Sequence, residues 1–251
     1  MEKYAVFLDF DGTIGYDFTE VKIHPDNIET IKSVRSLGHK VFLCTGRSGG
    51  FIPEFITDSI EFDGIIAGMG AEIYVDNAVL RRELISSEEV YKIVDYFVKN
   101  GHGVRLEGPD NVYSTYPSKR YDFVIIKSAD DYKKANYPIT SILIKNYPDE
   151  DIMKRLSKKY ELARHDGCFE FSAKGCTKEN AMDILLKHTG IPLSHSIAIG
   201  DSTNDLGMLK HAAIGIAMGN AYEDVKKIIK LTTDTCENAG VAKALNKYLL
   251  S

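Results

Sequence analysis

The stretch FLDFDGTIG, residues 7–15, ends a hydrophobic run in two aspartates, Asp9 and Asp11, that are one residue apart. The run itself, residues 4–8, is apolar and has the length of a buried strand. Alternate side chains of an extended chain point the same way, so both carboxylates should face one spot. Such crowding of negative charge requires a cation, a shared proton or open water. Taken alone, DFDG also fits the turn chemistry that ends many strands.

Strands and helices alternate on both sides of this stretch. Apolar residues at helical spacing predict a helix over residues 26–37, and KVFLCTGR, residues 40–47, is typical of a second buried strand that ends in a polar turn. A third strand is predicted in FDGIIAGMG, residues 62–70, and the same alternation returns over residues 196–250. This pattern predicts an α/β fold with a Rossmann-like parallel-sheet core.

The middle of the chain has a different pattern. It combines a helical segment, residues 86–101, with strand-like segments such as GVRLEG at 103–108 and CFEFSA at 168–173. We therefore expect an inserted α+β domain over residues 83–172, which divides one core domain into residues 1–82 and 173–251.

Composition narrows the classes of function. The chain has 251 residues, is 44% hydrophobic and carries a formal net charge of −5, which predicts a folded globular protein without a broad nucleic-acid surface. Its four cysteines form no CxxC pair, so neither a zinc site nor a disulfide framework is indicated. No apolar segment approaches the ~18 residues that span a membrane. We expect a cytoplasmic protein that binds neither nucleic acid nor membrane.

Polar clusters gather at the ends of the predicted strands, where open parallel sheets bind ligands. The clusters are Asp9 and Asp11; Thr45, Gly46 and Arg47; Asp201, Asn204 and Asp205; and Lys178, which follows the predicted N-cap Thr177 of a helix. A lysine in a first helical turn is disfavoured by the helix dipole, so Lys178 indicates a specific role. Each cluster alone fits turn or surface chemistry, but their joint occurrence at successive strand ends indicates a site.

These residues resemble the four motifs of the haloacid dehalogenase superfamily of phosphotransferases in order and spacing: DFDGT at 9–13, TGR at 45–47, Lys178, and GDSTND at 200–205. The long insertion between the second and third motifs resembles the Cof-type branch, whose members carry an α/β cap of the C2 type.

Two residues depart from the pattern of that branch. Met69 stands where the branch often has Asn, and Glu179 stands where Gly often follows the motif lysine. We expect either change to alter substrate preference without altering the reaction centre.

The resemblance implies a Mg²⁺-dependent phosphomonoester hydrolase that acts on sugar phosphates or similar small phosphorylated metabolites through an aspartyl-phosphate. The resemblance implies that Asp9 is the nucleophile and Asp11 the general acid and base. Thr45 and Lys178 would bind the phosphoryl oxygens, and Gly46 and Arg47 would bind the substrate. Asp9, Asp201 and the backbone carbonyl of Asp11 would hold the Mg²⁺ ion, and Asn204 and Asp205 would fix the water molecules around the ion. The segment GYDFTEVK, residues 15–22, would shield the site.

The cap would select substrates by closing over the site. Its polar and aromatic side chains suit hydroxyl-rich ligands, and the candidate readers are Arg105, Glu107, Tyr113, Tyr116, Lys119 and Arg120. Of these we expect only a few to touch the substrate.

Two other functions use similar residues. A phosphomutase has a similar core but would isomerise the sugar phosphate instead of releasing free phosphate. A metal- or phosphate-binding regulatory domain would also use acidic strand ends, yet it has little need of Asp11 as a proton donor.

Overall fold

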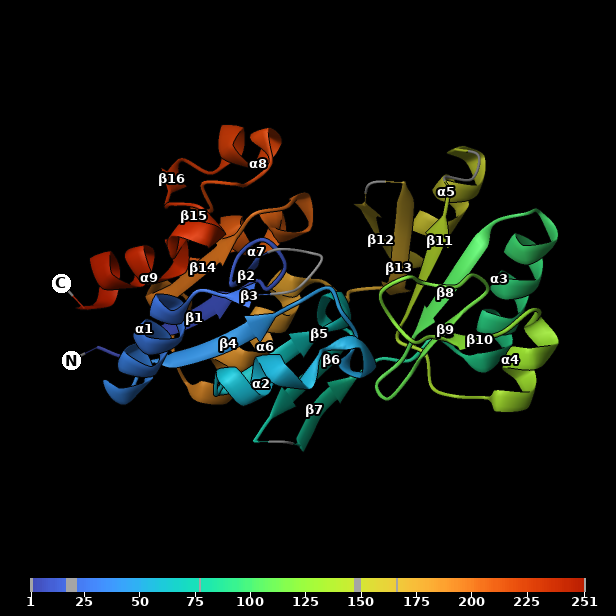
Figure 1. Cartoon of the computed structure of the whole chain (residues 1–251), viewed down its shortest axis with the longest axis horizontal. Helices are drawn as coiled ribbons and strands as arrows, with labels where there is room; N and C mark the ends of the chain where they lie inside the picture. The colour runs from blue at the N-terminus through green and yellow to red at the C-terminus, as the bar shows by residue number, and fades with distance from the viewer. Residues whose placement is uncertain (1, 17–21, 77, 147–149, 166, 251) are drawn as a thin grey trace.

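The computed structural model describes residues 2–16, 22–76, 78–146, 150–165 and 167–250. It has two parts, which Figure 1 shows side by side. The core holds both termini at the end away from the second part, and the second part, which we call the cap, joins the core through two connections. The predicted α/β class with an inserted α+β cap is confirmed.

The core is built on an eight-stranded sheet of order β16-β15-β14-β1-β4-β5-β6-β7. Its strands are β1 Ala5–Leu8, β4 Lys40–Cys44, β5 Gly64–Ala67, β6 Glu72–Val75, β7 Ala78–Arg82, β14 Ser196–Gly200, β15 Ile214–Ala217 and β16 Leu231–Thr232. β1 lies between β4 and β14 and is parallel to both. Because β1, β4 and β14 end at the same edge of the sheet, the polar residues that follow each of them are brought together.

The edge of this sheet differs from the parallel pattern expected from the sequence. β6 pairs antiparallel with β5, and β7 pairs antiparallel with β6. The chain reverses through the 3₁₀ turn Gly68–Gly70, where both glycines and Met69 have positive φ. Gly70 is required there, because a Cβ would lie 2.5 Å from the backbone oxygen of Thr177.

Helices cover both faces of the core sheet. They are α1 Pro25–Ser36, α2 Glu54–Ser59, α6 Lys178–Thr189, α7 Leu206–His211, α8 Glu223–Ile228 and α9 Gly240–Leu245. α1 packs against α9, and α6 packs against α7. After α9 the chain continues as a π-helical turn at Asn246–Leu250. Every helix in the described ranges is too short or too polar to cross a membrane.

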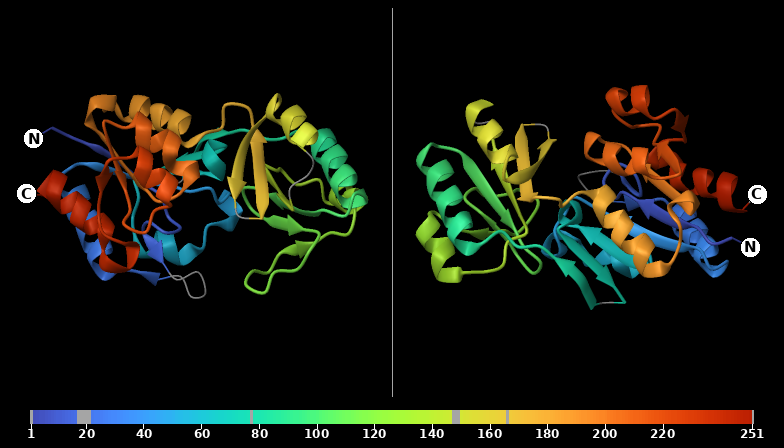
Figure 2. Two further views of the ribbon diagram at one scale, coloured as in Figure 1. Left: turned by 90° about the horizontal axis from the view of Figure 1, so that it is seen from above. Right: turned by 180° about the vertical axis from the view of Figure 1, so that it is seen from behind.

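The cap is a six-stranded sheet with helices on one face. Its order is β10-β9-β8-β11-β13-β12, with β8 Gly103–Glu107, β9 Val112–Ser114, β10 Val124–Ile125, β11 Ser141–Lys145, β12 Tyr160–His165 and β13 Cys168–Ala173. The helices α3 Ser87–Lys99, α4 Ala129–Ala135 and α5 Glu150–Ser157 lie on the side away from the core in both views of Figure 2. The opposite face of the sheet is therefore directed toward the core.

A short hairpin follows the turn after β1. β2 Gly15–Tyr16 pairs antiparallel with β3 Lys22–Ile23. The middle of the segment expected to shield the site, residues 17–21, lies outside the described residues.

Asp63, just before β5, joins three elements of the core. Its carboxylate accepts hydrogen bonds from Arg35 Nε, Lys40 Nζ and the Val41 backbone N–H, each at 2.9 Å. Burial alone would raise the pKa of Asp63, but the hydrogen bonds from Arg35 and Val41 outweigh it and lower that pKa. A carboxylate with a lowered folded-state pKa stabilises the fold above its ordinary value of 3.8, and this stabilisation is lost as the pH falls through the lower pKa.

We expect Asp63→Asn to lower the free energy of unfolding by about 1 to 2 kcal/mol at pH 7, because charge-assisted hydrogen bonds are lost. Urea unfolding of both proteins should show this difference shrinking as the pH is lowered through 4 and below. Glu61→Gln is the control, since Glu61 pairs with the same Arg35 but is 83% exposed; it should change stability little. A difference for Asp63→Asn that stays constant down to pH 3 would contradict this assignment.

Candidate active site

Asp9 and Asp11 follow β1 and both line one cavity, but each has its own cationic partner. Asp9 is 5% exposed, and its backbone N–H donates to Ile199 O at 3.0 Å, which continues the pairing with β14. Its Oδ1 accepts a hydrogen bond from Lys178 Nζ at 2.7 Å. Asp11 is paired instead with Arg47. The repulsion expected between the two aspartates is thus offset by two separate cations.

Lys178 opens α6 and is fully buried. The Thr177 side chain caps the helix by accepting from the Asn180 N–H. Nζ of Lys178 donates to Asp9 Oδ1 and, at 2.6 Å, to Asp205 Oδ1. Burial alone would lower the pKa of Lys178, but Asp205 and Asp9 outweigh it and raise that pKa well above its usual range. These two carboxylates explain how a lysine is tolerated in the first turn of a helix.

Asp205 shapes the turn that follows β14. Its Oδ2 accepts from the backbone N–H groups of Asp201 at 3.1 Å and Ser202 at 3.0 Å. Because Oδ1 binds Lys178, both oxygens of Asp205 have partners within the protein. This side chain therefore fixes the turn that carries Asp201.

Asp201 is positioned against the first motif. Thr13 Oγ1 donates to its Oδ1 at 3.4 Å, and Gly12 lies against its carboxylate. Gly12 has a φ of +87°, and a Cβ there would lie 2.4 Å from Asp201 Oδ2. Asn220 also holds this turn, because its Nδ2 donates to Gly12 O at 2.7 Å. Glycine is therefore the residue that this turn requires.

Asp9, Asp201 and Asp205 form an acidic cluster in which one carboxylate oxygen of each lies within 4.8 Å of the others. Burial, and next to it the charge of Asp205, raise the pKa of Asp9 well above its usual range and that of Asp201 to about 7. A divalent cation would relieve this repulsion, and carboxylate oxygens are suitable ligands for a hard cation. The residues of the cluster thus fit a divalent metal site.

Asn204 lies beside this cluster. Its Oδ1 accepts from Ser202 Oγ at 2.5 Å, and its Nδ2 points to Met69 Sδ at 3.7 Å. Met69, one of the two departures from the branch pattern, is thus in contact with a motif residue. Glu179, the other, packs against Gly207, where a Cβ would lie 2.2 Å from its carboxylate.

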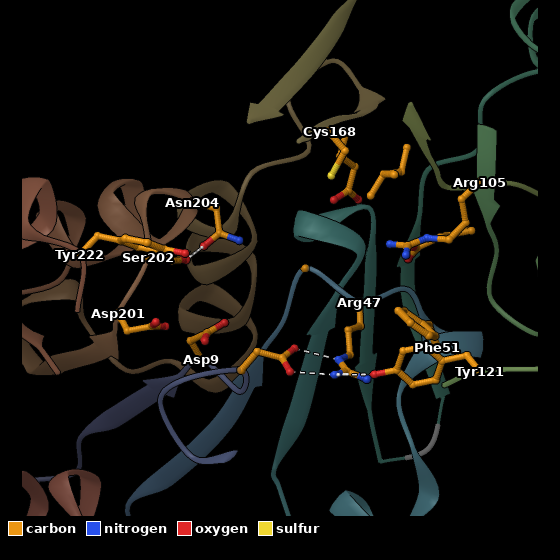
Figure 3. A pocket seen from close by; sticks show the side chains of 15 residues that line it. Asp9, Arg47, Phe51, Arg105, Tyr121, Cys168, Asp201, Ser202, Asn204 and Tyr222 are labelled. Atoms are coloured by element: carbon orange, nitrogen blue, oxygen red, sulfur yellow. Dashed lines mark hydrogen bonds and ion pairs between the residues drawn. The ribbon is translucent and has the colours of Figure 1, made fainter. Parts of the chain in front are cut away.

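Arg47 follows β4 and forms a bidentate ion pair with Asp11. Nε donates to Oδ2 at 2.8 Å and Nη2 to Oδ1 at 2.7 Å. The guanidinium carbon lies 5.1 Å from the ring centroid of Phe51, and Nη2 reaches the hydroxyl of Tyr121 in the cap at 3.5 Å. Thr45 supports this loop by accepting from the Arg47 N–H at 3.1 Å. Figure 3 shows Arg47 between the core and the cap.

The cavity between the two parts has a volume of about 400 Å³. Its core wall is formed by Asp9, Asp11, Gly46, Arg47, Phe51, Asp201, Ser202, Asn204 and Tyr222, and its cap wall by Arg105, Glu107, Tyr121, Leu143, Cys168 and Glu170. Thr45, Lys178 and Asp205 are buried outside this lining. The cavity is in the size range of small-molecule sites.

Only two of the six candidate readers in the cap line this cavity. Arg105 and Glu107 do, whereas Tyr113 stacks on Tyr137 at 5.4 Å and Tyr116, Lys119 and Arg120 are not part of the lining. Tyr121 and Glu170 also line the cavity, although they are not among the readers expected from the sequence. Glu170 could have been found, because in CFEFSA it alternates with Phe169 and Phe171, which are buried among the cap's apolar residues.

Comparisons with known proteins show which family the chain matches. A family model described as haloacid dehalogenase-like hydrolase matches residues 6–245. The chain is 28% identical to a 5-amino-6-(5-phospho-D-ribitylamino)uracil phosphatase of Bacillus subtilis, over 98% of this chain and 95% of that one. It is 26% identical to a phosphoglycolate phosphatase of Nitrosopumilus maritimus, over 98% and 96%. The solved structure of a sugar phosphatase of HAD subclass IIB superimposes with a TM-score of 0.84 and 27% identity, covering 98% of this chain and 99% of that one.

We expect Lys178→Met to lower the free energy of unfolding by about 3 to 5 kcal/mol in the absence of divalent cations, because two buried carboxylates lose their cation. Chemical denaturation at neutral pH measures this. Lys187→Met is the matched control, since Lys187 is an exposed lysine of the same helix. Equal stability of the two variants would show that the buried lysine does not neutralise the acidic cluster.

Proposed function

The chain belongs to the haloacid dehalogenase-like hydrolases, and from this membership and the geometry of the site we propose that it hydrolyses small phosphate monoesters through a phosphorylated Asp9. The resemblance that the motifs suggest is confirmed. The reaction class is supported by relatives that are named phosphatases. The observation that carries the proposal is that Asp9 and Asp11 line one cavity, each held by a different cation.

Asp9 would be the nucleophile. One of its oxygens accepts from Lys178, which leaves Oδ2 to attack phosphorus. The new bond joins this oxygen to phosphorus as the ester P–O bond breaks. Asp11, which lines the same cavity, would donate a proton to the departing alkoxide.

Water completes the reaction. Asp11, now a carboxylate, would take a proton from a water molecule that attacks the phosphorus of the aspartyl-phosphate. The P–O bond to Asp9 breaks, inorganic phosphate leaves, and both aspartates return to their starting states.

Arg47 would connect substrate binding to the release of Asp11. Its Nη1 is buried and has no hydrogen-bond partner among the described residues, although its other nitrogens bind Asp11. Phosphate oxygens match a guanidinium as well as a carboxylate does. A bound phosphoryl group would therefore compete with Asp11 for Arg47, and the released carboxylate could take up from solvent the proton that it passes to the leaving group. Gly46 would let the phosphoryl group approach the backbone. Thr45 and Lys178 would donate hydrogen bonds to the phosphoryl oxygens.

We propose Mg²⁺ as the cation of the acidic cluster, because it prefers oxygen ligands and retains part of its water shell. Asp9, Asp201 and the backbone carbonyl of Asp11 would hold it. Asn204 would bind its water, and Asp205 would act by fixing the turn of Asp201. When bound, the cation would offset the negative charge of the carboxylates and the phosphoryl oxygens.

We also propose the cytoplasm as the location, on the basis of the four cysteines, which form no disulfide with one another.

Release of phosphate from p-nitrophenyl phosphate, with and without Mg²⁺, tests the reaction class. We expect turnover that requires the cation and that yields free phosphate in step with p-nitrophenol. A panel of sugar phosphates would then separate a hydrolase from a mutase, because a mutase returns an isomerised ester. Binding of phosphate without turnover of any ester would favour a regulatory domain instead.

Asp9→Asn should reduce turnover at least about 100-fold, because the amide keeps the shape of the carboxylate but not its nucleophilic charge. Steady-state phosphate release measures this, with circular dichroism to verify folding. Asp58→Asn, at an exposed position of α2, is the control and should retain full activity. Turnover by Asp9→Asn above about a hundredth of wild type would exclude Asp9 as the nucleophile.

Asp11→Asn should slow the second step more than the first, since no other motif residue is placed to activate the water. Phosphate should then accumulate on Asp9, where peptide mass spectrometry after rapid quenching would detect it. We expect the overall rate to fall about 10²- to 10⁴-fold. An unchanged rate of phosphate release in this variant would contradict the acid and base role.

A further inference from the structure

The loop that follows Arg47, residues 48–51, is held in place through its backbone N–H groups. Those of Ser48, Gly49 and Gly50 donate, in that order, to Glu107 Oε2 at 3.3 Å, Glu72 Oε1 at 3.2 Å and Gly108 O at 3.1 Å. Two of these acceptors belong to the cap, and the third, Glu72, begins core strand β6. Groups outside the loop therefore set the path of its backbone.

Glu72 has a fully buried carboxylate that binds three donors. Besides the Gly49 N–H, its Oε1 accepts from Thr140 Oγ1 of the cap at 2.9 Å, and its Oε2 accepts from the Tyr74 hydroxyl. A buried carboxylate is costly unless hydrogen-bond donors converge on it. Because these donors come from the loop, the cap and β6 itself, Glu72 holds the Gly49 N–H at a fixed point between the core and the cap.

The segment that carries Glu72 also binds the backbone of Arg47. The N–H of Gly68, four residues before Glu72, donates to Arg47 O at 2.8 Å. The carbonyl of Arg47 and the N–H of Gly49 are thus both bonded to residues 68–72. The chain between these two groups cannot shift without breaking one of the bonds, and leaving a buried polar group without its partner is costly.

The loop also determines where the guanidinium of Arg47 lies. The ring of Phe51, the last residue of the loop, has its centroid 5.1 Å from the guanidinium carbon of Arg47 and 4.7 Å from the ring centroid of Tyr121. Figure 3 shows Arg47, Phe51 and Tyr121 side by side. A shift of the loop at Gly49 would move Phe51 and with it the surface on which Arg47 packs. Bidentate binding of a phosphoryl group by a guanidinium tolerates little displacement.

Gly49 is the point of closest approach between the loop and Glu72. A Cβ at this position would lie 2.9 Å from Glu72 Oε2 and 2.5 Å from the Tyr74 hydroxyl oxygen. Gly49 is not among the glycines with positive φ, so the space around it, and not its backbone conformation, excludes a side chain. A side chain at position 49 would therefore push the loop away from Glu72.

We propose that Glu72 is a positioning residue for phosphate binding: through the Gly49 N–H it fixes the loop that aims Arg47 at the phosphoryl group. Glu72 is not among the residues that line the cavity, so it acts through Arg47 and not on the substrate. This inference rests on the proposed function, in which Arg47 binds the phosphoryl group, and it adds a residue that lies outside the four motifs.

Titration calorimetry with inorganic phosphate in the presence of Mg²⁺, together with the kinetics of p-nitrophenyl phosphate hydrolysis, tests the proposal. Glu72→Gln keeps the size of the side chain but has one acceptor oxygen for three donors. We expect the Kd for phosphate and the KM to rise at least about fivefold, because the charge-assisted bonds of Arg47 are weakened. The change in kcat should stay within about twofold, since Arg47 binds the phosphoryl group in the ground state and in the transition state alike.

Gly49→Ala disrupts the same contact from its other end and leaves Glu72 in place. It should raise the Kd for phosphate and the KM in the same way, so the test stands even where Glu72→Gln does not fold. Glu54→Gln, at an exposed position of α2, is the control for the loss of one carboxylate and should change neither constant. Circular dichroism and thermal unfolding verify that each variant is folded at the assay temperature.

A double-mutant cycle with Arg47→Ala distinguishes positioning from a purely structural role. If Glu72 acts through Arg47, Glu72→Gln should change kcat/KM less than about twofold once the guanidinium is absent. An equal loss of kcat/KM in the presence and absence of Arg47 would refute the proposal. So would folded variants, Glu72→Gln and Gly49→Ala, that bind phosphate as tightly as the wild type does.

The outcomes separate this inference from the proposed function. A wild-type protein that binds phosphate but hydrolyses no ester would refute the phosphatase function, while the titrations would still test the role of Glu72. A wild-type protein that hydrolyses p-nitrophenyl phosphate, with variants whose KM and Kd for phosphate are unchanged, would refute the positioning role alone.

Discussion

The ion pairs of Lys178 with Asp9 and Asp205 are the interaction on which the rest of the site depends. They join residues that are 169 and 27 positions apart in the chain and hold β1, the turn after β14 and the start of α6 together. A buried cation with two carboxylates is stable only where its geometry is satisfied, so the contacts that position Asp9 also fix the centre of the core sheet. Asp9, the proposed nucleophile, thus also stabilises the centre of the fold.

A second pair of buried carboxylates connects the cap to the core. Glu107 of the cap accepts from the Ser48 N–H, and Glu72 of β6 accepts from the Gly49 N–H and from Thr140 Oγ1 of the cap. The contacts of Ser48 and Gly49 lie in the loop that follows Arg47, and Glu72 links this loop to Thr140 of the cap. The orientation of the cap and the position of Arg47 are therefore set by one segment, and Tyr121 adds a direct contact from the cap to Arg47. The residues proposed for substrate recognition and for proton transfer thus meet at this loop.

The sequence predicts the centre of the protein better than its edges. Strand ends with Asp9, Thr45 and Asp201 could be predicted because apolar runs and parallel connections bring such ends together. The pairing of Asp11 with Arg47 could not, since nothing local to either residue indicates the other. The antiparallel β6 and β7 were missed because the reversal depends on three residues with positive φ. In the cap, the candidate readers are predicted from the type of side chain alone. Which of them face the cavity depends on the alternation of side chains along each strand.

The order of strands also affects how the chain is made. β1 pairs with β4 early in the sequence, but its other neighbour, β14, begins only at Ser196. On the ribosome, all strands of the cap sheet emerge before β14 does. One edge of β1 therefore stays unpaired while the cap strands can already pair with one another. All four residues of β1 are buried in the finished protein, and an apolar edge of this kind is a site for aggregation. The open edge of β1 is therefore covered only after β14 has left the ribosome.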